Sequence, residues 1–299
     1  MKLHALQALV TAVDTGSLRS AARNLGVSQP ALSKLIRELE HSLSATLLLR
    51  SSQGVKLTEQ GEVLYTHGRK VLHELASATD KIQQLGGQFQ GVIKVAAVPV
   101  AMLLLVPETL RTFNREFPDI RLRIHEELFV HQLQRLRTGE VDLVVGGIPA
   151  GLPAGEFVAE PLLHTVMVPV VRLGHPLARA GSLAQLAKQR WVYTSMNTDT
   201  GYASLLFEQH GLAAPPVGAV VNSTLGLLTL LAASDFVGLL PRQIAQHPLA
   251  RQHVVAVPIQ EPGLQLNVGA IVRRDTALAT SVRQLINHLH RAAHPLQSA

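Results

Sequence analysis

The residues best suited to contact a nucleic acid lie in one short segment near the N-terminus. Residues 28–37 read SQPALSKLIR, in which hydroxyl, amide and cationic side chains alternate with aliphatic ones. Leu32, Leu35 and Ile36 recur at helical spacing and must face a core, so the polar residues share the opposite face of a helix. Such a face suits base edges and phosphates in the major groove. We predict base contacts from Gln29, Pro30 and Ser33, and phosphate contacts from Ser28, Lys34, Arg37, Arg50 and Lys56.

Two short helices joined by a tight turn are expected to position this face. Ser17 and Ser28 are suited to cap the two helices, and Gly26 to end the first, because glycine adopts the left-handed conformation at little cost. Residues 3–13 predict another amphipathic helix that closes a three-helix core. The run at 47–58, LLLRSSQGVKLT, predicts a β-hairpin wing with Gly54 at its tip. Taken alone, the pattern also fits two packed helices of an ordinary α domain.

From residue 59 the pattern changes to one long helix with a heptad seam. Apolar or small residues alternate four and three positions apart, and the glycine pair at 86–87 ends the run. Such a seam predicts a homodimer whose two recognition helices read a near-palindromic site, and Gly68 within it would allow close approach of the two copies. The alternative is a helix that packs on its own domain. The residues expected to contact the partner are Leu64, Val71, Leu75, Ala78, Ile82 and Leu85.

Residues 91–299 alternate strand-like and helix-like runs, which is typical of an α/β fold with parallel strands. The pattern predicts a first strand at 91–98 and a helix at 104–117. Small molecules bind beyond the carboxyl ends of such strands, so we expect a cleft for a small-molecule effector there. The hydroxyl and amide residues among them equally serve as helix caps. The residues expected to line the cleft are Pro99, Val100, Ala101, Ile148, Thr194, Ser195, Thr198, Asn222 and Ser223.

The chemistry of the expected cleft is more apolar than ionic. Its four segments, at 98–101, 147–149, 194–200 and 222–224, contain no Lys or Arg. This favours a small ligand with an apolar part, with any anionic group held by backbone N–H and hydroxyl groups. Asp199 is the one acidic residue in these segments, and it would accept hydrogen bonds from a hydroxylated or cationic ligand unless it only shapes the loop.

Composition and motifs narrow the classes of protein further. With 299 residues, 47% of them hydrophobic, the chain is expected to form two or three domains, and the lack of cysteine excludes disulfides and thiolate metal sites. Residues 1–58 hold seven Lys and Arg against three Asp and Glu, so most of the formal net charge of +6 lies where DNA contact is expected. No catalytic, metal or cofactor motif occurs, and His288, His290 and His294 are expected to be surface residues, so we expect no enzyme. Without a membrane span or signal peptide, a cytoplasmic location is expected.

The stretches GSLRSAARNLGVSQPALSKLIRELE and LLLRSSQGVKLTEQG resemble the winged helix of LysR-type transcriptional regulators. The resemblance is strong over residues 2 to about 88, and the remainder is similar in layout. It implies a winged helix–turn–helix DNA-binding domain at 1–58, a dimerisation helix at 59–88 and an effector-binding domain at 91–299. The effector domain would have two α/β lobes similar to periplasmic binding proteins, lobe I at 91–160 and 265–294 and lobe II at 161–264.

The same resemblance implies a homotetramer of two dimers. Separately, the lack of an uncharged apolar run of 18 residues predicts no membrane partner. The resemblance also exposes three departures from the family pattern. Ser44 replaces a usual Gly and Leu48 a usual Phe, which places the packing of the wing in question. Residues 99–101 are apolar where the family often holds a carboxylate effector with Ser or Thr.

Three other readings of the chain stay open at this point. One is a ligand-binding or transport-like module whose N-terminal helices bind a protein partner. Another is a DNA-binding regulator that needs no effector. The third is an enzyme on the α/β lobes, against which the missing nucleophile–base arrangement argues.

Overall fold

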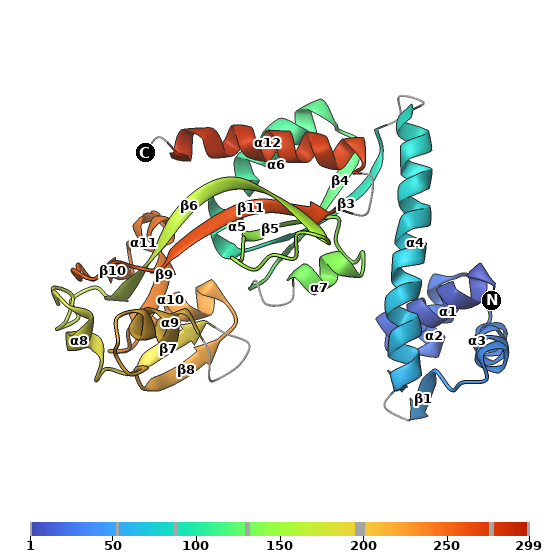
Figure 1. The fold of residues 1–299 in the computed structure, drawn as a ribbon, viewed down its shortest axis with the longest axis horizontal. Coiled ribbons are helices and arrows are strands. Elements are labelled where there is room, and N and C mark those ends of the chain that lie inside the picture. The colour runs from blue at the N-terminus through green and yellow to red at the C-terminus, as the bar shows by residue number, and fades with distance from the viewer. Residues whose placement is uncertain are drawn as a thin grey trace. The chain divides into compact units, whose positions relative to one another are not determined.

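The computed structural model describes residues 2–51, 54–85, 89–128, 132–194, 201–274 and 278–297. The chain divides into two units, the first of residues 1–86 with 137–140, and the second of residues 87–136 with 141–299. Figure 1 shows the helical first unit and the α/β second unit, which confirms the predicted fold class.

The core of the first unit is built by the three helices α1 (Leu3–Asp14), α2 (Leu18–Asn24) and α3 (Gln29–Leu43). As predicted, Ser17 caps α2 by accepting from the Ser20 N–H. Gly26 follows α2 with a φ of +65°, a conformation that a residue without Cβ adopts cheaply. The inward faces of the three helices form one buried cluster that includes Leu9, Ala22, Leu32, Ile36 and Leu39.

A hairpin and a long helix complete this unit. The hairpin pairs β1 (Leu48–Ser51) with β2 (Gly54–Leu57), and the helix is α4 (Glu59–Leu85). Leu48 is buried in the cluster of the three helices, so leucine at this position still anchors the wing. Thr58 begins α4 by accepting from the Gly61 N–H at 3.0 Å.

The second unit is organised around a mixed sheet, which contains the expected parallel strands together with antiparallel ones. Strand β3 (Gly91–Ala97) pairs in parallel with β4 (Ile120–Glu126) and β5 (Leu143–Gly147). Beside β5 runs β11 (Gln265–Arg273), which is antiparallel to both β5 and the 16-residue β6 (Phe157–Arg172). Because β11 runs opposite to its neighbours β5 and β6, the strands of this sheet do not all share one direction.

The long strand β6 continues past the first group of strands into a second one. Its C-terminal half pairs with β9 (Gly238–Pro241) and β10 (Val254–Ala256), while β7 (Trp191–Thr194) and β8 (Val217–Val221) form a separate parallel pair. The two long strands β6 and β11 lie side by side across the unit (Figure 1). A predicted lobe boundary at residue 161 thus falls inside a continuous strand.

Eight helices accompany these strands in the described part of the chain, and four of them have only four to six residues. The helix expected at 104–117 is divided differently: residues 99–104, which directly follow β3, form a separate helix α5, and α6 begins at Val106. The helices are α5 (Pro99–Leu104), α6 (Val106–Glu116), α7 (Gln132–Arg137), α8 (Leu183–Leu186), α9 (Tyr202–Gln209), α10 (Thr224–Ala232), α11 (Arg242–Gln246) and α12 (Thr280–Gln297).

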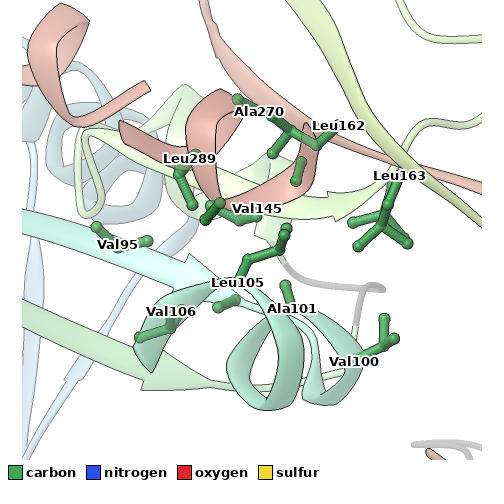
Figure 2. Packing of buried hydrophobic residues seen from close by; sticks show 14 of the residues in the cluster. Val95, Val100, Ala101, Leu105, Val106, Val145, Leu162, Leu163, Ala270 and Leu289 are labelled. Atoms are coloured by element: carbon green, nitrogen blue, oxygen red, sulfur yellow. The ribbon is translucent and has the colours of Figure 1, made fainter. Parts of the chain in front are cut away.

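One buried cluster joins the two groups of strands. Figure 2 shows Val95, Val145 and Leu289 packed around Leu105 in the part built on β3, β5 and α12. The same cluster continues through residues of α5 and α11 to the second group of strands. One continuous apolar core therefore extends through both groups. Burial at this scale is the main stabilising contribution to the unit.

Helix α12 is held to the sheet and to α6 by polar contacts that the sequence pattern does not reveal. His288, expected on the surface, is buried between α12 and α6, with Nδ1 2.8 Å from Thr112 Oγ1 and Nε2 3.1 Å from Glu116 Oε2. Glu160 of β6 accepts from Arg283 at 2.6 Å and lies 3.1 Å from His290 Nε2. Partial burial pushes the pKa of Glu160 upward, but the hydrogen bonds from these two partners outweigh it and hold the pKa below its ordinary value.

Candidate nucleic-acid interface and ligand cavity

Helix α3 presents a polar face to solvent because its apolar face forms the core. Ser28 caps the helix by accepting from the Ala31 N–H at 3.3 Å, and Pro30 lies in the first turn, where its missing N–H costs little. The predicted contact residues lie on the outer side of this helix. Ser33 is half-buried, and the exposed ones are Ser28, Gln29, Pro30, Lys34 and Arg37.

The two cations on this face are weakly engaged. Lys34 Nζ lies 3.9 Å from Glu38 Oε1, and both side chains are well exposed, so the pair is worth at most about 1 kcal/mol. Arg37 forms no ion pair within the described part of the chain. Both side chains are therefore available to phosphate oxygens without losing a strong internal partner.

The wing is fastened to the helices at its base and its tip. Glu40 Oε1 of α3 accepts from the Leu47 N–H at 2.8 Å and the Leu48 N–H at 3.2 Å, which fixes where the hairpin begins. At the other end the Val55 N–H donates to the Gly16 carbonyl at 3.2 Å. Gly54 has a φ of +119°, and a Cβ there would lie 2.4 Å from that carbonyl oxygen, so only glycine fits.

The two predicted wing contacts have different outcomes. Lys56, on β2, is exposed next to Val55, the residue whose N–H bonds to the Gly16 carbonyl. The side chain of Arg50 lies outside the described residues, so its predicted phosphate contact stays a prediction.

The predicted dimer seam of α4 divides into two parts. Leu64 is half-buried against the cluster of the three helices. A Cβ at Gly68 would lie 2.7 Å from Leu6 Cδ1, so the expectation that Gly68 admits a second copy is wrong: the chain's own first helix fills that space.

The second half of the seam is uncovered in the single chain. Val71 and Leu75 are each 46% exposed and Ile82 is 71% exposed, and Ala78 lies exposed between them. The side chain of Leu85 falls outside the described residues. An apolar row of this kind on a long helix is typical of a helix–helix interface.

A polar cluster missed by the sequence interpretation ties α4 to α1. The Tyr65 hydroxyl donates to Asp14 Oδ1 at 2.5 Å, and Arg69 Nη1 lies 3.2 Å from the same oxygen and 2.8 Å from the Tyr65 hydroxyl. Burial, together with the hydrogen bond to Asp14, raises the pKa of Tyr65. Tyr65 and Arg69 lie 51 and 55 positions from Asp14 in the sequence, so no local pattern predicts that they meet this carboxylate.

The second unit contains a cavity of about 440 Å³ beside β6, β9 and β11. Aliphatic side chains supply most of its wall, and hydroxyl groups and one carboxylate supply the rest. The apolar lining includes Val98, Pro99, Val100, Leu128, Met167, Leu205, Leu239, Leu240, Pro241, Ile244, Leu266 and Val268. The polar side chains in the lining are Thr194, Tyr202, Ser204, Glu208 and Thr224.

Three of the predicted cleft residues line this cavity, namely Pro99, Val100 and Thr194. Ala101 does not, because it lies one position further along helix α5 and is fully buried in the core. Ile148 packs in a separate apolar cluster, and its neighbour Gly147 reaches the cavity instead.

The remaining predicted cleft residues divide between capping and the undescribed loop. Ser223 caps α10 by accepting from the Gly226 N–H at 3.0 Å, which is the capping role left open above. Asn222 beside it is exposed, and Thr224 faces the cavity in their place. Ser195 and Thr198 lie outside the described residues.

The largest part of the wall missed from the sequence is one face of α9 and the segment from β9 to α11. Ser204, Leu205 and Glu208 follow at helical spacing, which places them on one side of α9. The sequence pattern of residues 235–241, DFVGLLP, indicates only a strand and gives this segment no role in the cleft. Its Leu-Leu-Pro end at a strand terminus was the available signal.

The described residues provide neither a metal site nor a membrane-spanning helix. They contain no group of three or more metal-ligating side chains that could hold an ion. None of the helices placed in the structure is long and apolar enough to span a bilayer.

Comparison with known proteins defines the class. Residues 3–62 match the bacterial regulatory helix-turn-helix protein, lysR family, and residues 86–294 match the LysR substrate binding domain. The chain therefore belongs to the LysR family. It is a DNA-binding transcriptional regulator with an effector-binding domain.

Individual relatives agree with this assignment. The HTH-type transcriptional regulator GalR of Pseudomonas putida is 29% identical over 294 residues, covering 94% of this chain and 73% of that protein. A full-length OxyR variant from Pseudomonas aeruginosa has a similar structure, with a TM-score of 0.74, 24% identity, and coverage of 99% and 97% of the two chains. Full-length CbnR, solved with its target DNA, gives a TM-score of 0.68 at 20% identity and covers 98% of this chain and all of that one.

Proposed function

We propose that α3 reads a promoter site through its outer face and that the wing grips the adjacent backbone. The observation that carries this proposal is the two-sided character of α3, with Leu32 and Ile36 fully buried and Lys34 and Arg37 exposed without a strong partner. Gln29, Pro30 and Ser33 would contact bases, and Ser28, Lys34, Arg37, Arg50 and Lys56 would contact phosphates. The structure of CbnR with its target DNA makes the same mode of action reasonable for this chain.

We propose that two copies pair through the exposed half of α4. Val71, Leu75, Ala78 and Ile82 would form the seam, with Leu85 at its end, while Leu64 would act inside its own chain. Two linked recognition helices would require a near-palindromic site. Dimers would further assemble into a homotetramer, as the family resemblance implies.

We propose that the cavity binds a small effector that changes DNA affinity, without chemical conversion of the ligand. Such control requires the effector to bind the two DNA-binding states with different affinity. The polar side chains of the wall supply hydroxyls and one carboxylate, which suit recognition, and none of them forms a nucleophile–base pair. A regulator that needs no effector is the alternative, and ligand binding to the full chain separates the two.

The experiment that tests the DNA-binding proposal is footprinting and salt-dependent titration on the promoter of the neighbouring gene. Lys34→Ala should weaken all sites alike and flatten the dependence on salt by about one phosphate, whereas Ser33→Ala should change sequence preference. Lys188→Ala, an exposed cation of the second unit, serves as the matched control and should leave both unchanged. Equal effects of the Lys34 and Lys188 substitutions would contradict the assignment.

A further inference from the structure

The electrostatic character of the cavity differs from that of a site built for an anion. Glu208 is the one charged side chain among its described lining residues, and no Lys, Arg or His accompanies it there. A carboxylate in this space would meet like charge from Glu208, and the described lining residues provide no cationic side chain to offset it.

The helix that begins at the cavity wall can offer an anion only the backbone N–H groups of its first turn, without a hydroxyl or a cationic side chain. Pro99 occupies the first position of α5 and carries no backbone N–H, and Val98 already donates its own N–H to the Val145 carbonyl at 3.0 Å. The neighbouring cavity side chain, Val100, has no hydroxyl. At the start of α10, the Gly226 N–H is already bonded to Ser223.

Glu208 itself is available to a ligand. It lies on the α9 face that carries Ser204 and Leu205. Its side chain is exposed, and its carboxylate forms no hydrogen bond or ion pair with any residue in the described part of the chain. Ser204 donates to the Tyr193 hydroxyl at 3.1 Å, so this serine offers acceptor lone pairs to the cavity. The wall thus presents hydrogen-bond acceptors beside a large apolar surface.

We propose that the cavity binds an apolar small molecule with an amine head, whose ammonium group pairs with the Glu208 carboxylate. The aliphatic side chains of Val100, Leu240, Ile244 and Val268 would enclose the apolar body. A charge-assisted hydrogen bond to Glu208 would orient the head, with Ser204 as a second acceptor. This inference rests on the proposed effector role of the cavity and specifies the class of effector.

The test compares ligands that share one apolar body and differ only in the head group. Phenethylamine, phenethyl alcohol and hydrocinnamate form one series, and hexylamine, hexanol and heptanoate form another. Each would be titrated into the full-length protein by calorimetry, with thermal stabilisation as a second readout. We expect the amine of each series to bind most tightly and the carboxylate least.

Two variants assign the binding to this wall. Glu208→Gln should weaken amine binding roughly tenfold and leave alcohol binding nearly unchanged, because the charge-assisted bond is lost. Leu205→Trp, at a half-exposed position in the wall, should weaken binding of every head group by filling the cavity. Glu126→Gln, an exposed glutamate of β4, is the matched control and should change nothing.

Several outcomes would overturn the proposal. Tighter binding of the carboxylates would mean that N–H groups at the start of α9 outweigh Glu208. An equal loss of amine binding in the Glu126 and Glu208 variants, or no binding by either amine, would equally refute it. Footprints recorded on the same samples separate the two proposals: protected promoter DNA with a preference for carboxylates keeps the regulator and rejects the amine site.

Discussion

Replacing Leu75 with Asp should separate two copies of the protein while leaving each DNA-binding domain folded. Leu75 is 46% exposed in the single chain, so dimerisation can bury about half of its surface in each copy. Burying a whole leucine is worth about 1.5–3 kcal/mol, so the two half-burials contribute about the same amount together. Two aspartates meeting in the seam add roughly 1–3 kcal/mol of desolvation and repulsion. The sum, about 2.5–6 kcal/mol, weakens the dimer by roughly sixtyfold to twenty-thousandfold.

Sedimentation velocity across a concentration series measures this dissociation constant, and gel shifts on one and two half-sites report its effect on DNA. Ala76→Asp adds the same charge one position away from the seam, at an exposed residue, and should leave the dimer intact. Leu64→Asp should instead unfold the three-helix core, because Leu64 packs against it. A Leu75→Asp protein with an unchanged dimer dissociation constant would refute the proposal that the exposed residues of α4 pair two copies while Leu64 packs within its own chain.

Three further predictions concern stability. Ser44, after α3, has a φ of +49° and is the one non-glycine residue with positive φ in the described chain. Ser44→Gly should therefore raise the free energy of unfolding, measured in urea melts, by about 0.5–1 kcal/mol. A lower free energy of unfolding in this variant would contradict the inference that Ser44 is strained. Gly54→Ala should cost about 2–4 kcal/mol and release the wing, seen as faster hydrogen exchange of the Val55 amide; unchanged exchange would show that the close approach is not limiting. Glu160 has a lowered pKa, so its contribution to stability is complete above its ordinary value of 4.5 and is lost as the pH falls through its folded pKa. Glu160→Gln should remove that part of the acid sensitivity, and an unaltered pH profile between about pH 5 and 3 would show that Glu160 is not its source.

The DNA-binding domain could be predicted closely because its signals are local. Ser28, Pro30 and the spacing of Leu32 and Ile36 specify the start, the cap and the buried face of α3 within a few positions. The wing follows from a similar local signal, a glycine between two short apolar runs. What the sequence did not reveal is the contact of Gly68 with Leu6, since those two residues are far apart in the chain and the heptad pattern alone cannot say which helix fills the seam.

The cavity was predicted less well, and the reason is physical. The carboxyl ends of strands identified Pro99, Val100 and Thr194, but a cavity wall needs only one or two residues from each element. Leu240 and Ile244 come from a strand and a short helix whose patterns look like ordinary core. Ser223 illustrates the opposite error, because a serine before a helix satisfies backbone N–H groups whether or not a ligand lies nearby.

The position of the cavity relative to the core bears on how a ligand could act. Val100, Leu240, Ile244 and Val268 line the cavity and also belong to the buried cluster that joins the two groups of strands. A ligand there would contact the same side chains that hold these groups together, so its binding would directly favour one packing arrangement of these side chains over another. Closely packed cores have few alternative arrangements, and a ligand that favours one of them selects a discrete state. Such coupling would pass along β6, since its N-terminal half pairs with β11 of the first group of strands and its C-terminal half pairs with β9 and β10 of the second.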